Sequence, residues 1–567
     1  MKIEDINNLK TGDNITSLTG WVDTVRHHGG LLFFELRDYK SKIQVVTDIP
    51  DKFEELKNEY YVSIDGILST REEQNINQES DFGTYEIKLL KLDIISKSKT
   101  LPFQIEDHID VDEVIRLKYR YLDLRRDAMN SNILYRSNTF KAIREFMSIS
   151  NINEIDTPTL IKSTPEGAKD FIVPSRKSPG KFYALPQSPQ MYKQLFMLSG
   201  FENYYQIAKC YRDEDSRKDR QPEFTQLDLE LSNATPELVM KVIENTVKYV
   251  LTEVYGININ NDFERLSYKD SIAKYGTDKP DLRIEKTIQD FTDIFINTEI
   301  SFIKDAIDNG GLVRGFIIEK ILSRSEIDKL DKAIKELGSP GLGWFKIENN
   351  NISGPLSKVL NKDEVSAILK YRDSTMLFQA GRIEEFSPSL DFIRRNLYLP
   401  SSTSELMFLW VNDFPYFHDE DGELQPSHHP FTSPVDSTEF LNDPNNAKAL
   451  HYDLVLNGVE LGSGSQRVND PDLQKKIFQK WGLSEQEISD RFGWFLEALS
   501  YGSPQHAGFA IGIDRFVAEM VSADSIRDVI PFPKTQSGLD PLTDAPTPLS
   551  KQELLEYNIE IQKEDDE

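Results

Sequence analysis

The first candidate for chemistry in this sequence is a charged stretch at residues 211–230, which reads YRDEDSRKDRQPEFTQLDLE. Segments 204–212 and 223–231 alternate like strands, so the charged residues between them form the long loop of a predicted hairpin. Arg212 closes the first strand, where its guanidinium can make a two-pronged contact with a phosphate or a carboxylate. Phe224 opens the second strand and can lie flat against a nucleobase. The loop tip adds cations for a phosphate backbone: Arg217, Lys218 and Arg220.

Two carboxylates lie close together in segment 451–468, which reads HYDLVLNGVELGSGSQRV. A glycine turn separates Asp453 from Glu460, so the two residues are predicted to lie on adjacent strands. Mg²⁺ prefers hard oxygen ligands and often shares them with the phosphates of a nucleotide. The small residues of LGSGSQR let a ligand approach the backbone, and Arg467 can face an anionic side chain. The segment therefore predicts a site for magnesium and an anionic ligand.

Two further segments place small residues where a ligand can approach. Residues 163–176, STPEGAKDFIVPSR, predict a loop that can close over a ligand, with Glu166 at its tip to receive an ammonium group. Residues 503–516, SPQHAGFAIGIDRF, predict a strand that leads into a helix, with Arg515 in its first turn as a phosphate contact. Their glycine spacing differs from the dinucleotide fingerprint, and neither a Walker motif nor HExxH is present.

Each segment has a simpler structural explanation when it is taken alone. The charged run also fits a solvated loop, residues 163–176 an exposed turn, and the carboxylate pair a solvated sheet face. The net charge of −28 disfavours indiscriminate binding of nucleic acid, because the long-range field repels phosphates. Any contact with RNA must therefore come from specific arginine, lysine and aromatic residues.

Composition and the termini set further limits. Cys210 is the one cysteine, which excludes an internal disulfide framework and a multi-cysteine metal cluster. No apolar run approaches the roughly 20 residues of a membrane span. The N-terminal segment MKIEDINNLKTGD has no export or import signal. With 567 residues, we expect a cytoplasmic protein of several domains that has no membrane contact.

The first hundred residues predict a small barrel of the OB type, which we assign to residues 1–102. Short strands separated by turn residues are expected at 15–22, 31–37, 42–47, 60–68 and 85–95. Alternation in segment 31–37 turns Leu32, Phe34 and Leu36 toward the core. Phe33 lies on the other face with Glu35 and Arg37, where it is either a stacking platform or a partly buried barrel residue.

The rest of the chain predicts a larger α/β domain that is split by an insertion. Residues 103–133 are charged and lack an apolar stripe, as a hinge would, and a periodic helix follows at 133–150. We expect one α/β domain from 134–282 and 409–546, an inserted α+β domain at 283–408, and an acidic C-terminal extension at 547–567.

Taken together and in this order, these segments resemble a class II aminoacyl-tRNA synthetase of subclass IIb, most closely the bacterial-type aspartyl-tRNA synthetases. NEIDTPTL, ending at Pro158, resembles motif 1, a dimer-interface element. Residues 211–230 resemble motif 2, GFAIGIDRF resembles motif 3, and STPEGAKDF is similar to the loop that closes on the amino acid. The resemblance implies an OB-fold anticodon-binding domain, a catalytic domain on an antiparallel sheet flanked by helices, an inserted domain, and a homodimer.

The resemblance also implies roles for individual residues. Arg212 would bridge the ATP α-phosphate and the substrate carboxylate, and Arg515 would contact the γ-phosphate; these two are the implied catalytic residues. The implied aspartate-binding residues are Glu166, Ser188, Gln190, Lys193, Arg212, Asp228, His428 and Arg467. The implied ATP-binding residues are Arg212, Asp213, Glu214, Gln221, Phe224, Glu460, Gly512, Ile513, Asp514 and Arg515, and the implied Mg²⁺ ligands are Asp453 and Glu460.

The reaction implied is the activation of L-aspartate by ATP and its transfer to tRNA. The aspartate carboxylate attacks the α-phosphorus, pyrophosphate leaves, and the terminal ribose hydroxyl of tRNA then attacks the aspartyl-adenylate. In-line positioning and neutralisation of charge suffice, without a protein nucleophile. We expect Lys193 and Arg467 to reject asparagine, because an amide would leave these buried cations unpaired. Ser463 stands where the family usually has glycine.

Recognition of tRNA would fall to the barrel. By resemblance, an anticodon base stacks on Phe33, and Arg26 and Gln44 read base edges nearby. His28 matches a histidine in relatives that resemble enzymes charging both tRNA(Asp) and tRNA(Asn). Gly83 is grouped with His28 as a residue implied in discrimination between tRNAs. We therefore expect relaxed anticodon reading, with tRNA(Asp) and tRNA(Asn) both as partners.

Several alternatives remain open. The enzyme can be strictly specific for tRNA(Asp), or it can be an asparaginyl- or lysyl-tRNA synthetase of the same subclass, against which Lys193, Arg467 and the insertion count. A non-catalytic RNA-binding relative would be expected to lose Arg212, Glu460 or Arg515, and all three are present. An adenylate-forming ligase that does not use tRNA is disfavoured by the N-terminal barrel.

Overall fold

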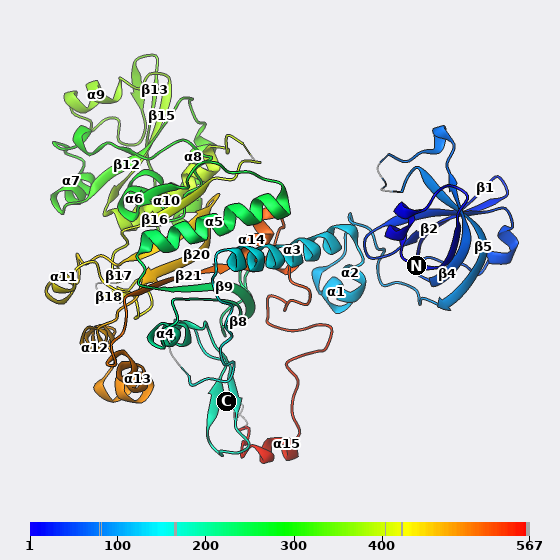
Figure 1. Ribbon diagram of the computed structural model, residues 1–567. Coiled ribbons are helices and arrows are strands. Elements are labelled where there is room, and N and C mark those ends of the chain that lie inside the picture. Colours follow the sequence, from blue (N-terminus) through cyan, green and yellow to red (C-terminus); the bar gives the residue numbers. More distant parts are fainter. Residues whose placement is uncertain (79, 81, 164–166, 403, 421–422, 563–567) are drawn as a thin grey trace. The chain divides into compact units, whose positions relative to one another are not determined.

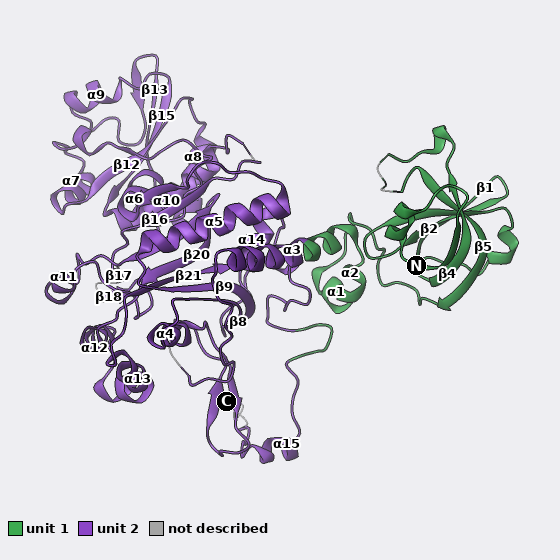
Figure 2. Ribbon diagram, viewed as in Figure 1, with its two compact units in different colours: residues 1–134, 540–545 green, residues 135–539, 546–567 purple. Residues whose placement is uncertain are grey.

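The computed structural model describes residues 1–562 except 79, 81, 164–166, 403 and 421–422. It divides the chain into two compact units, residues 1–134 with 540–545 and residues 135–539 with 546–567 (Figure 2). Glu166, expected at the tip of a ligand-closing loop, lies outside the described residues. Within them, no helix is both long and apolar enough to cross a membrane.

The first unit contains a closed five-stranded barrel (Figure 1). Its strands are β1 (Asn14–His28), β2 (Leu31–Arg37), β3 (Lys42–Thr47), β4 (Tyr61–Thr70) and β5 (Tyr85–Ser96), joined in the order β1-β2-β3-β5-β4. The β3–β5 pair is parallel and the other pairs are antiparallel. Leu32, Phe34 and Leu36 are at most 1% exposed, so the alternation predicted for β2 is confirmed. Short 3₁₀ helices lie at Ile3–Asn8, Pro50–Phe53 and Glu73–Asn75.

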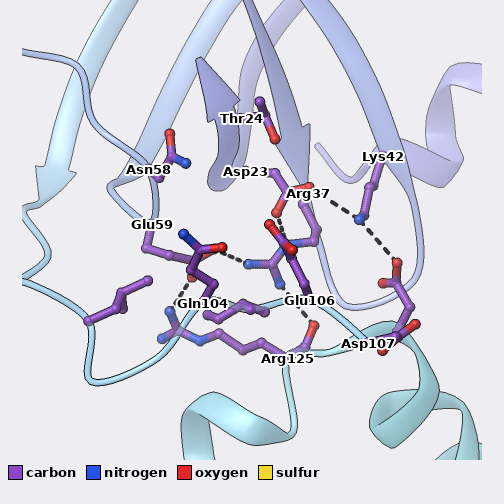
Figure 3. A pocket seen from close by; sticks show the side chains of 13 residues that line it. Asp23, Thr24, Arg37, Lys42, Asn58, Glu59, Gln104, Glu106, Asp107 and Arg125 are labelled. Atoms are coloured by element: carbon purple, nitrogen blue, oxygen red, sulfur yellow. Dashed lines mark hydrogen bonds and ion pairs between the residues drawn. The ribbon is translucent and has the colours of Figure 1, made fainter. Parts of the chain in front are cut away.

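Arg37 departs from the predicted alternation, because it is buried at the end of β2 rather than exposed beside Phe33. Its guanidinium pairs with Glu59, lies 3.3 Å from Asp23 and donates to the backbone oxygen of Arg125. Arg125 in turn donates to Glu59 at 2.6 Å. These charges surround a cavity of about 340 Å³ within the first unit (Figure 3). Arg37 thus lies on the face of β2 opposite the core residues and is buried there because its ion-pair partners cover it.

Buried ion pairs are also present in the segment predicted as a hinge. Residues 103–133 contain α1 (Glu113–Lys118), α2 (Arg120–Asp123) and the start of α3 (Asp127–Ile149). Asp123 is fully buried and accepts from Arg120 at 2.5 Å and from Arg126 at 2.8 Å. Ion pairs thus hold this segment where an apolar stripe is missing.

A seven-stranded sheet organises the second unit, in the order β10-β16-β19-β20-β21-β9-β8. The strands are β8 (Asn203–Tyr211), β9 (Glu223–Ser232), β10 (Glu264–Ser267), β16 (Phe408–Asn412), β19 (His451–Leu456), β20 (Val459–Gln466) and β21 (His506–Gly512). The β10–β16 pair is parallel, and the remaining pairs are antiparallel. The antiparallel sheet flanked by helices that the family resemblance implied is therefore present.

Strict alternation gives this sheet two different faces. On β9, Leu227 and Leu229 are buried in the core with residues of α3, α5 (Pro236–Tyr255) and α14 (Ile513–Met520). Helix α5 begins at Pro236 after the cap Thr235, which accepts from the Leu238 amide, and ends at Gly256 with φ of 68°. The opposite face of β9 carries Phe224, Gln226, Asp228 and Glu230, which leaves a polar surface for a site.

Segment 283–408 forms a second sheet in the order β11-β12-β15-β13-β14. Its strands are β11 (Gln289–Asp290), β12 (Leu312–Ile318), β13 (Gly343–Glu348), β14 (Asn351–Ser353) and β15 (Ser374–Gly381). Its helices are α7 (Ser301–Asp308), α8 (Arg324–Glu336), α9 (Lys362–Ile368) and α10 (Ile383–Leu397), with a 3₁₀ turn at Thr292–Ile294. This α+β segment has its own buried clusters but belongs to the same compact unit as the seven-stranded sheet.

The remaining elements surround the seven-stranded sheet or lie in the C-terminal segment. They are β6 (Ile172–Pro174), β7 (Phe182–Ala184), α4 (Gln190–Leu198), α6 (Tyr268–Tyr275), β17 (Phe417–Glu420), β18 (Glu423–Pro426), α11 (Ser437–Asn442), α12 (Pro471–Lys480), α13 (Glu485–Leu499), a 3₁₀ turn (Ile526–Asp528) and α15 (Lys551–Glu556). The strand-like run before Pro158 is irregular, with a single bridge between Glu154 and Tyr205.

We expect Glu59→Gln to destabilise the barrel by about 3 kcal/mol, because the buried Arg37 loses its closest carboxylate. Hydrogen exchange of the barrel amides in the full-length protein measures this change. Glu55→Gln is the matched control, since Glu55 pairs with Lys97 at 2.9 Å on the exposed surface, and no change is expected there. Equal protection in both variants would contradict a stabilising role for the buried network.

Candidate active site

A cavity of about 240 Å³ lies over the polar face of the seven-stranded sheet. Arg212 and Phe224 line it from the β8–β9 hairpin, Glu460 from β20 and Arg515 from α14. The Arg212 guanidinium lies 5.1 Å from the centroid of the Phe224 ring. A Cβ atom at Gly462 would lie 2.1 Å from the backbone oxygen of Ala510, so this position in the cavity wall requires glycine. With Arg220, the cavity thus offers three cations, together with an aromatic face and several carboxylates.

The hairpin loop is fixed by a distant segment that the sequence did not identify. Ser525 Oγ and the Ile526 amide both donate to the backbone oxygen of Lys218, at 3.0 and 3.1 Å. Gln221 donates to the backbone oxygen of Lys534 at 3.1 Å and accepts from its amide at 2.8 Å. Gln221 therefore holds the loop in place, in addition to lining the cavity.

Asp453 and Glu460 lie on the adjacent strands β19 and β20, as their spacing predicts. His451 Nε2 lies 2.8 Å from Asp453 Oδ1, and Lys279 Nζ lies 3.1 Å from Glu460 Oε2. Burial raises the pKa of the Asp453 carboxyl to about 8, while Lys279 opposes this shift and Asp278 adds to it. Burial lowers the pKa of His451 to about 3, so its ring is neutral.

Four buried charges form a network beneath the same face of the sheet. Lys193 of α4 lies 2.7 Å from Asp228 and 3.2 Å from Glu230. Arg467 donates through Nε and Nη2 to the two oxygens of Glu230, at 3.0 and 3.2 Å, and through Nη1 to Ser465 at 2.6 Å. All four charged side chains are at most 2% exposed. The two cations and two anions compensate one another.

This network changes the expected basis of selectivity. Lys193 and Arg467 were expected to be left unpaired by an asparagine side chain, but Asp228 and Glu230 already pair with them. Glu230 was missed by sequence reasoning, although the alternation that brings Asp228 to the polar face places Glu230 there as well. Burial favours a higher pKa for Glu230, yet Arg467 and Lys193 hold that pKa below its ordinary value.

Three polar atoms of residues expected to bind the amino acid are buried without a hydrogen-bond partner in the described part of the chain. They are Gln190 Nε2, Asp228 Oδ2 and His428 Nε2. The His428 ring stacks on His451 with centroids 3.7 Å apart. Burial, reinforced by His451, lowers the pKa of His428 well below its ordinary value. Buried polar atoms are nearly always hydrogen-bonded in proteins, so these three have room for hydrogen bonds from a ligand or an ordered water.

Other predicted residues lie nearby with their own contacts. Glu214 lines the cavity and lies 3.5 Å from Arg220. Ser188 lies two residues before helix α4, and the Asp213 amide donates to the backbone oxygen of Lys169. Gly512 lines the cavity, and Ile513 is buried in the core at the start of α14.

The structure does not gather all the predicted cations around one cavity. Arg212 and Arg515 line the cavity of about 240 Å³, whereas Arg467 is not among the described residues that line it. Asp514 pairs through its carboxylate with Arg136 and accepts from the Thr225 amide at 2.7 Å, so its side chain joins elements of the core. Ser463 lines the cavity opposite Asp453, where its small side chain is accommodated.

In the barrel unit, the predicted anticodon residues share one outward face. Arg26 pairs in register with Phe33, and His28 pairs with Leu31 at the same hairpin. Phe33 is half-buried, while Arg26 and His28 are exposed. Gln44 follows on β3, where its amide donates to Glu86 at 2.9 Å.

Gly83 lies in the loop before β5 rather than on this face. A Cβ atom there would lie 1.7 Å from the backbone oxygen of Asn77, so glycine is needed for the loop to close. The structure therefore assigns Gly83 a role in loop packing.

We expect Arg467→Leu to lower the free energy of unfolding by about 3 kcal/mol, because Glu230 stays buried without its two-pronged partner. Adding Glu230→Gln to this variant should recover part of the loss. Thermal denaturation of the full chain measures both effects. Lys475→Leu, which removes an exposed pair with Glu485, is the matched control and should leave the melting temperature unchanged. An Arg467→Leu variant as stable as the parent would contradict the charge compensation.

Comparison with known proteins agrees with this geometry. Residues 112–536 match the family model described as tRNA synthetases class II (D, K and N), and residues 16–95 match the OB-fold nucleic acid binding domain. The chain is 43% identical to an aspartate--tRNA(Asp/Asn) ligase of Hydrogenobaculum sp. (strain Y04AAS1), over 96% of both chains. It is also 43% identical to an enzyme of the same name from Dictyoglomus turgidum, over 98% of this chain and 97% of the relative.

Solved structures share the fold at lower identity. An asparaginyl-tRNA synthetase from Pyrococcus horikoshii, complexed with asparaginyl-adenylate, aligns with a TM-score of 0.58 and 20% identity over 93% of this chain and 95% of its own. A putative aspartyl-tRNA synthetase from Leishmania major aligns with a TM-score of 0.60 and 17% identity over 94% and 92%. At such identity the likeness shows the fold alone. The sequence matches span nearly the whole chain, which therefore belongs to the class II tRNA synthetases of the D, K and N family.

Proposed function

We propose that this chain is an aspartate–tRNA ligase that activates L-aspartate with ATP and charges both tRNA(Asp) and tRNA(Asn). The observation that carries the proposal is the set of unpartnered buried atoms on Gln190, Asp228 and His428. A small zwitterionic amino acid supplies hydrogen-bond donors and acceptors for all three. The names of the relatives favour aspartate over the other amino acids of the family.

The cavity beside these atoms has the chemistry that ATP requires. Adenine lies against Phe224, and Arg212 reaches both the α-phosphate and the attacking carboxylate. Arg515 neutralises the γ-phosphate from the start of α14. Because positioning and charge neutralisation supply most of the rate in phosphoryl transfer, no protein nucleophile is required.

Magnesium is the metal that fits the acidic pair. Among the described residues, no group of three or more histidine, cysteine or acidic side chains is arranged to hold a metal. Asp453 and Glu460 would hold the ion through carboxylate oxygens, and the nucleotide phosphates would supply further oxygen ligands, which is the sharing that Mg²⁺ favours. Bound there, the ion would neutralise phosphate charge, while Arg212 and Arg515 orient the nucleotide.

The barrel face with Arg26, His28 and Phe33 is the proposed anticodon site. Stacking of a base on an aromatic ring is worth roughly 1–3 kcal/mol and does not require a favourable net charge. That local contact reconciles RNA binding with the net charge of −28.

A homodimer is also proposed, since Ile149, Leu160 and Phe201 are exposed apolar residues near motif 1. Its role in translation places the enzyme in the cytoplasm.

ATP–pyrophosphate exchange tests the amino acid directly. We expect aspartate to support exchange, and asparagine and lysine to fail. Gln190→Leu should raise the KM for aspartate roughly tenfold, because it removes one buried hydrogen bond to the substrate. The KM for ATP should stay unchanged and serves as the internal control. Exchange that depends on asparagine or lysine would refute the assignment.

Charging of the two tRNAs tests the breadth of anticodon reading. We expect the protein to aminoacylate transcripts of tRNA(Asp) and tRNA(Asn), and His28→Ala to alter the ratio of the two kcat/KM values. The same variant should leave pyrophosphate exchange unchanged, because His28 lies in the barrel. Normal charging of tRNA(Asp) without any charging of tRNA(Asn) would instead support a strictly tRNA(Asp)-specific enzyme.

A further inference from the structure

A second cavity, of about 380 Å³, adjoins the first one on the side away from Phe224. Glu460, Arg220 and Arg515 line both cavities, so the two are neighbours. Lys279 lines the second cavity but not the first, and it lies on the segment that follows α6. The charge of this lysine lies directly beside the acidic pair Asp453 and Glu460.

The Lys279 ammonium group occupies a place suited to a cation. Its Nζ atom lies 3.1 Å from Glu460 Oε2 and 3.1 Å from Asp278 Oδ2. Glu460 is also one of the two proposed magnesium ligands. Two cations that share one carboxylate repel each other, so an ion bound at Glu460 would drive the ammonium group away. Asp278 would still pair with the ammonium group, and the phosphate tail of a nucleotide in the second cavity would offer it a further anion.

The inserted segment holds this lysine in position. Arg395 of α10 donates to the backbone oxygen of Lys279 at 3.0 Å. Its neighbour Arg394, which is fully buried, donates to the backbone oxygens of Asp281 and Ile284 at 3.2 and 3.0 Å. The lysine backbone is therefore anchored to a helix of the insertion, while its side chain is paired with Asp278 and Glu460.

We propose that Lys279 is a further catalytic residue, which contacts the β- and γ-phosphates of ATP and neutralises pyrophosphate as it leaves. The inference rests on the proposed function and deepens it. In this step a carboxylate oxygen of aspartate bonds to the α-phosphorus, the bond from phosphorus to the oxygen that bridges to the β-phosphate breaks, and the electron pair leaves with pyrophosphate. Lys279 keeps its proton and supplies only charge. Arg395 acts as a positioning residue, through the backbone of Lys279.

Lys279→Met tests this role, because methionine keeps the length of the side chain without the charge. We expect the rate of aspartate-dependent exchange to fall about 10²-fold. The KM for pyrophosphate should rise roughly tenfold, as expected for one lost charge-assisted hydrogen bond, and the KM for aspartate should stay unchanged. Lys279→Arg should recover part of the rate. Lys286→Met, which removes a lysine paired with Glu319 in the same segment, is the matched control and should behave like the parent.

A binding measurement separates this role from a structural one. Mn²⁺, used as a paramagnetic substitute for Mg²⁺, should bind the nucleotide-free Lys279→Met variant more tightly than the parent, because the competing ammonium group is gone. Arg395→Met should shift the KM for pyrophosphate in the same direction by a smaller factor. Unchanged pyrophosphate kinetics in Lys279→Met, or weaker binding of Mn²⁺, would overturn the proposal.

The proposed function and the role of Lys279 can be refuted separately. If the parent shows no aspartate-dependent exchange, the proposed function is wrong. If the parent is active and Arg515→Met is inactive while Lys279→Met is normal, the function stands and only the role of Lys279 is refuted.

Discussion

Compensation of buried charge is the constraint on which the amino acid site depends. Lys193, Arg467, Asp228 and Glu230 are almost fully buried, and none could stay ionised there alone. Their mutual pairing fixes the positions of the side chains on the sheet before any ligand arrives. Because pairing with Lys193 uses only one oxygen of Asp228, its other oxygen is left without a hydrogen-bond partner in the described part of the chain. The network therefore builds the site and leaves one of its contacts open.

The same principle operates at the acidic pair, with a different outcome. The carboxylate of Glu460 is partly exposed and is balanced by Lys279, whose flexible side chain can move. In contrast, Glu230 is held by the planar fork of Arg467, which makes two parallel contacts. A rigid pair suits selection of a small amino acid. A movable pair suits a place where charge enters with the nucleotide and leaves with pyrophosphate.

Local patterns made much of this site predictable. Alternation in EFTQLDLEL predicts the strand, its buried leucines and the polar face with Asp228, and it also indicates Glu230. The Gly turn between Asp453 and Glu460 predicts adjacent strands, which the structure shows. These predictions rest on contacts that the chain makes over a few residues. They hold because a one-residue change of register would reverse both faces of the strand.

Long-range contacts limited prediction from sequence. Nothing near Lys279 in the sequence indicates that it meets Glu460, because that contact depends on how separate elements pack. Arg37 likewise follows the pattern of an exposed face and is buried only because Glu59 and Asp23 receive it. Charged residues can lie on either side of a strand when partners come from elsewhere in the fold. Patterns of hydrophobicity therefore locate strands better than they locate ion pairs.

The insertion contacts the segments that carry Lys279 and the two carboxylates. Its helix α10 supplies Arg394 and Arg395, which bind the backbone of the segment that bears Lys279. Gly458, in the turn between the two carboxylate strands, packs against Arg395: a Cβ atom there would lie 3.1 Å from its guanidinium. The insertion thus contacts both the lysine segment and the carboxylate hairpin.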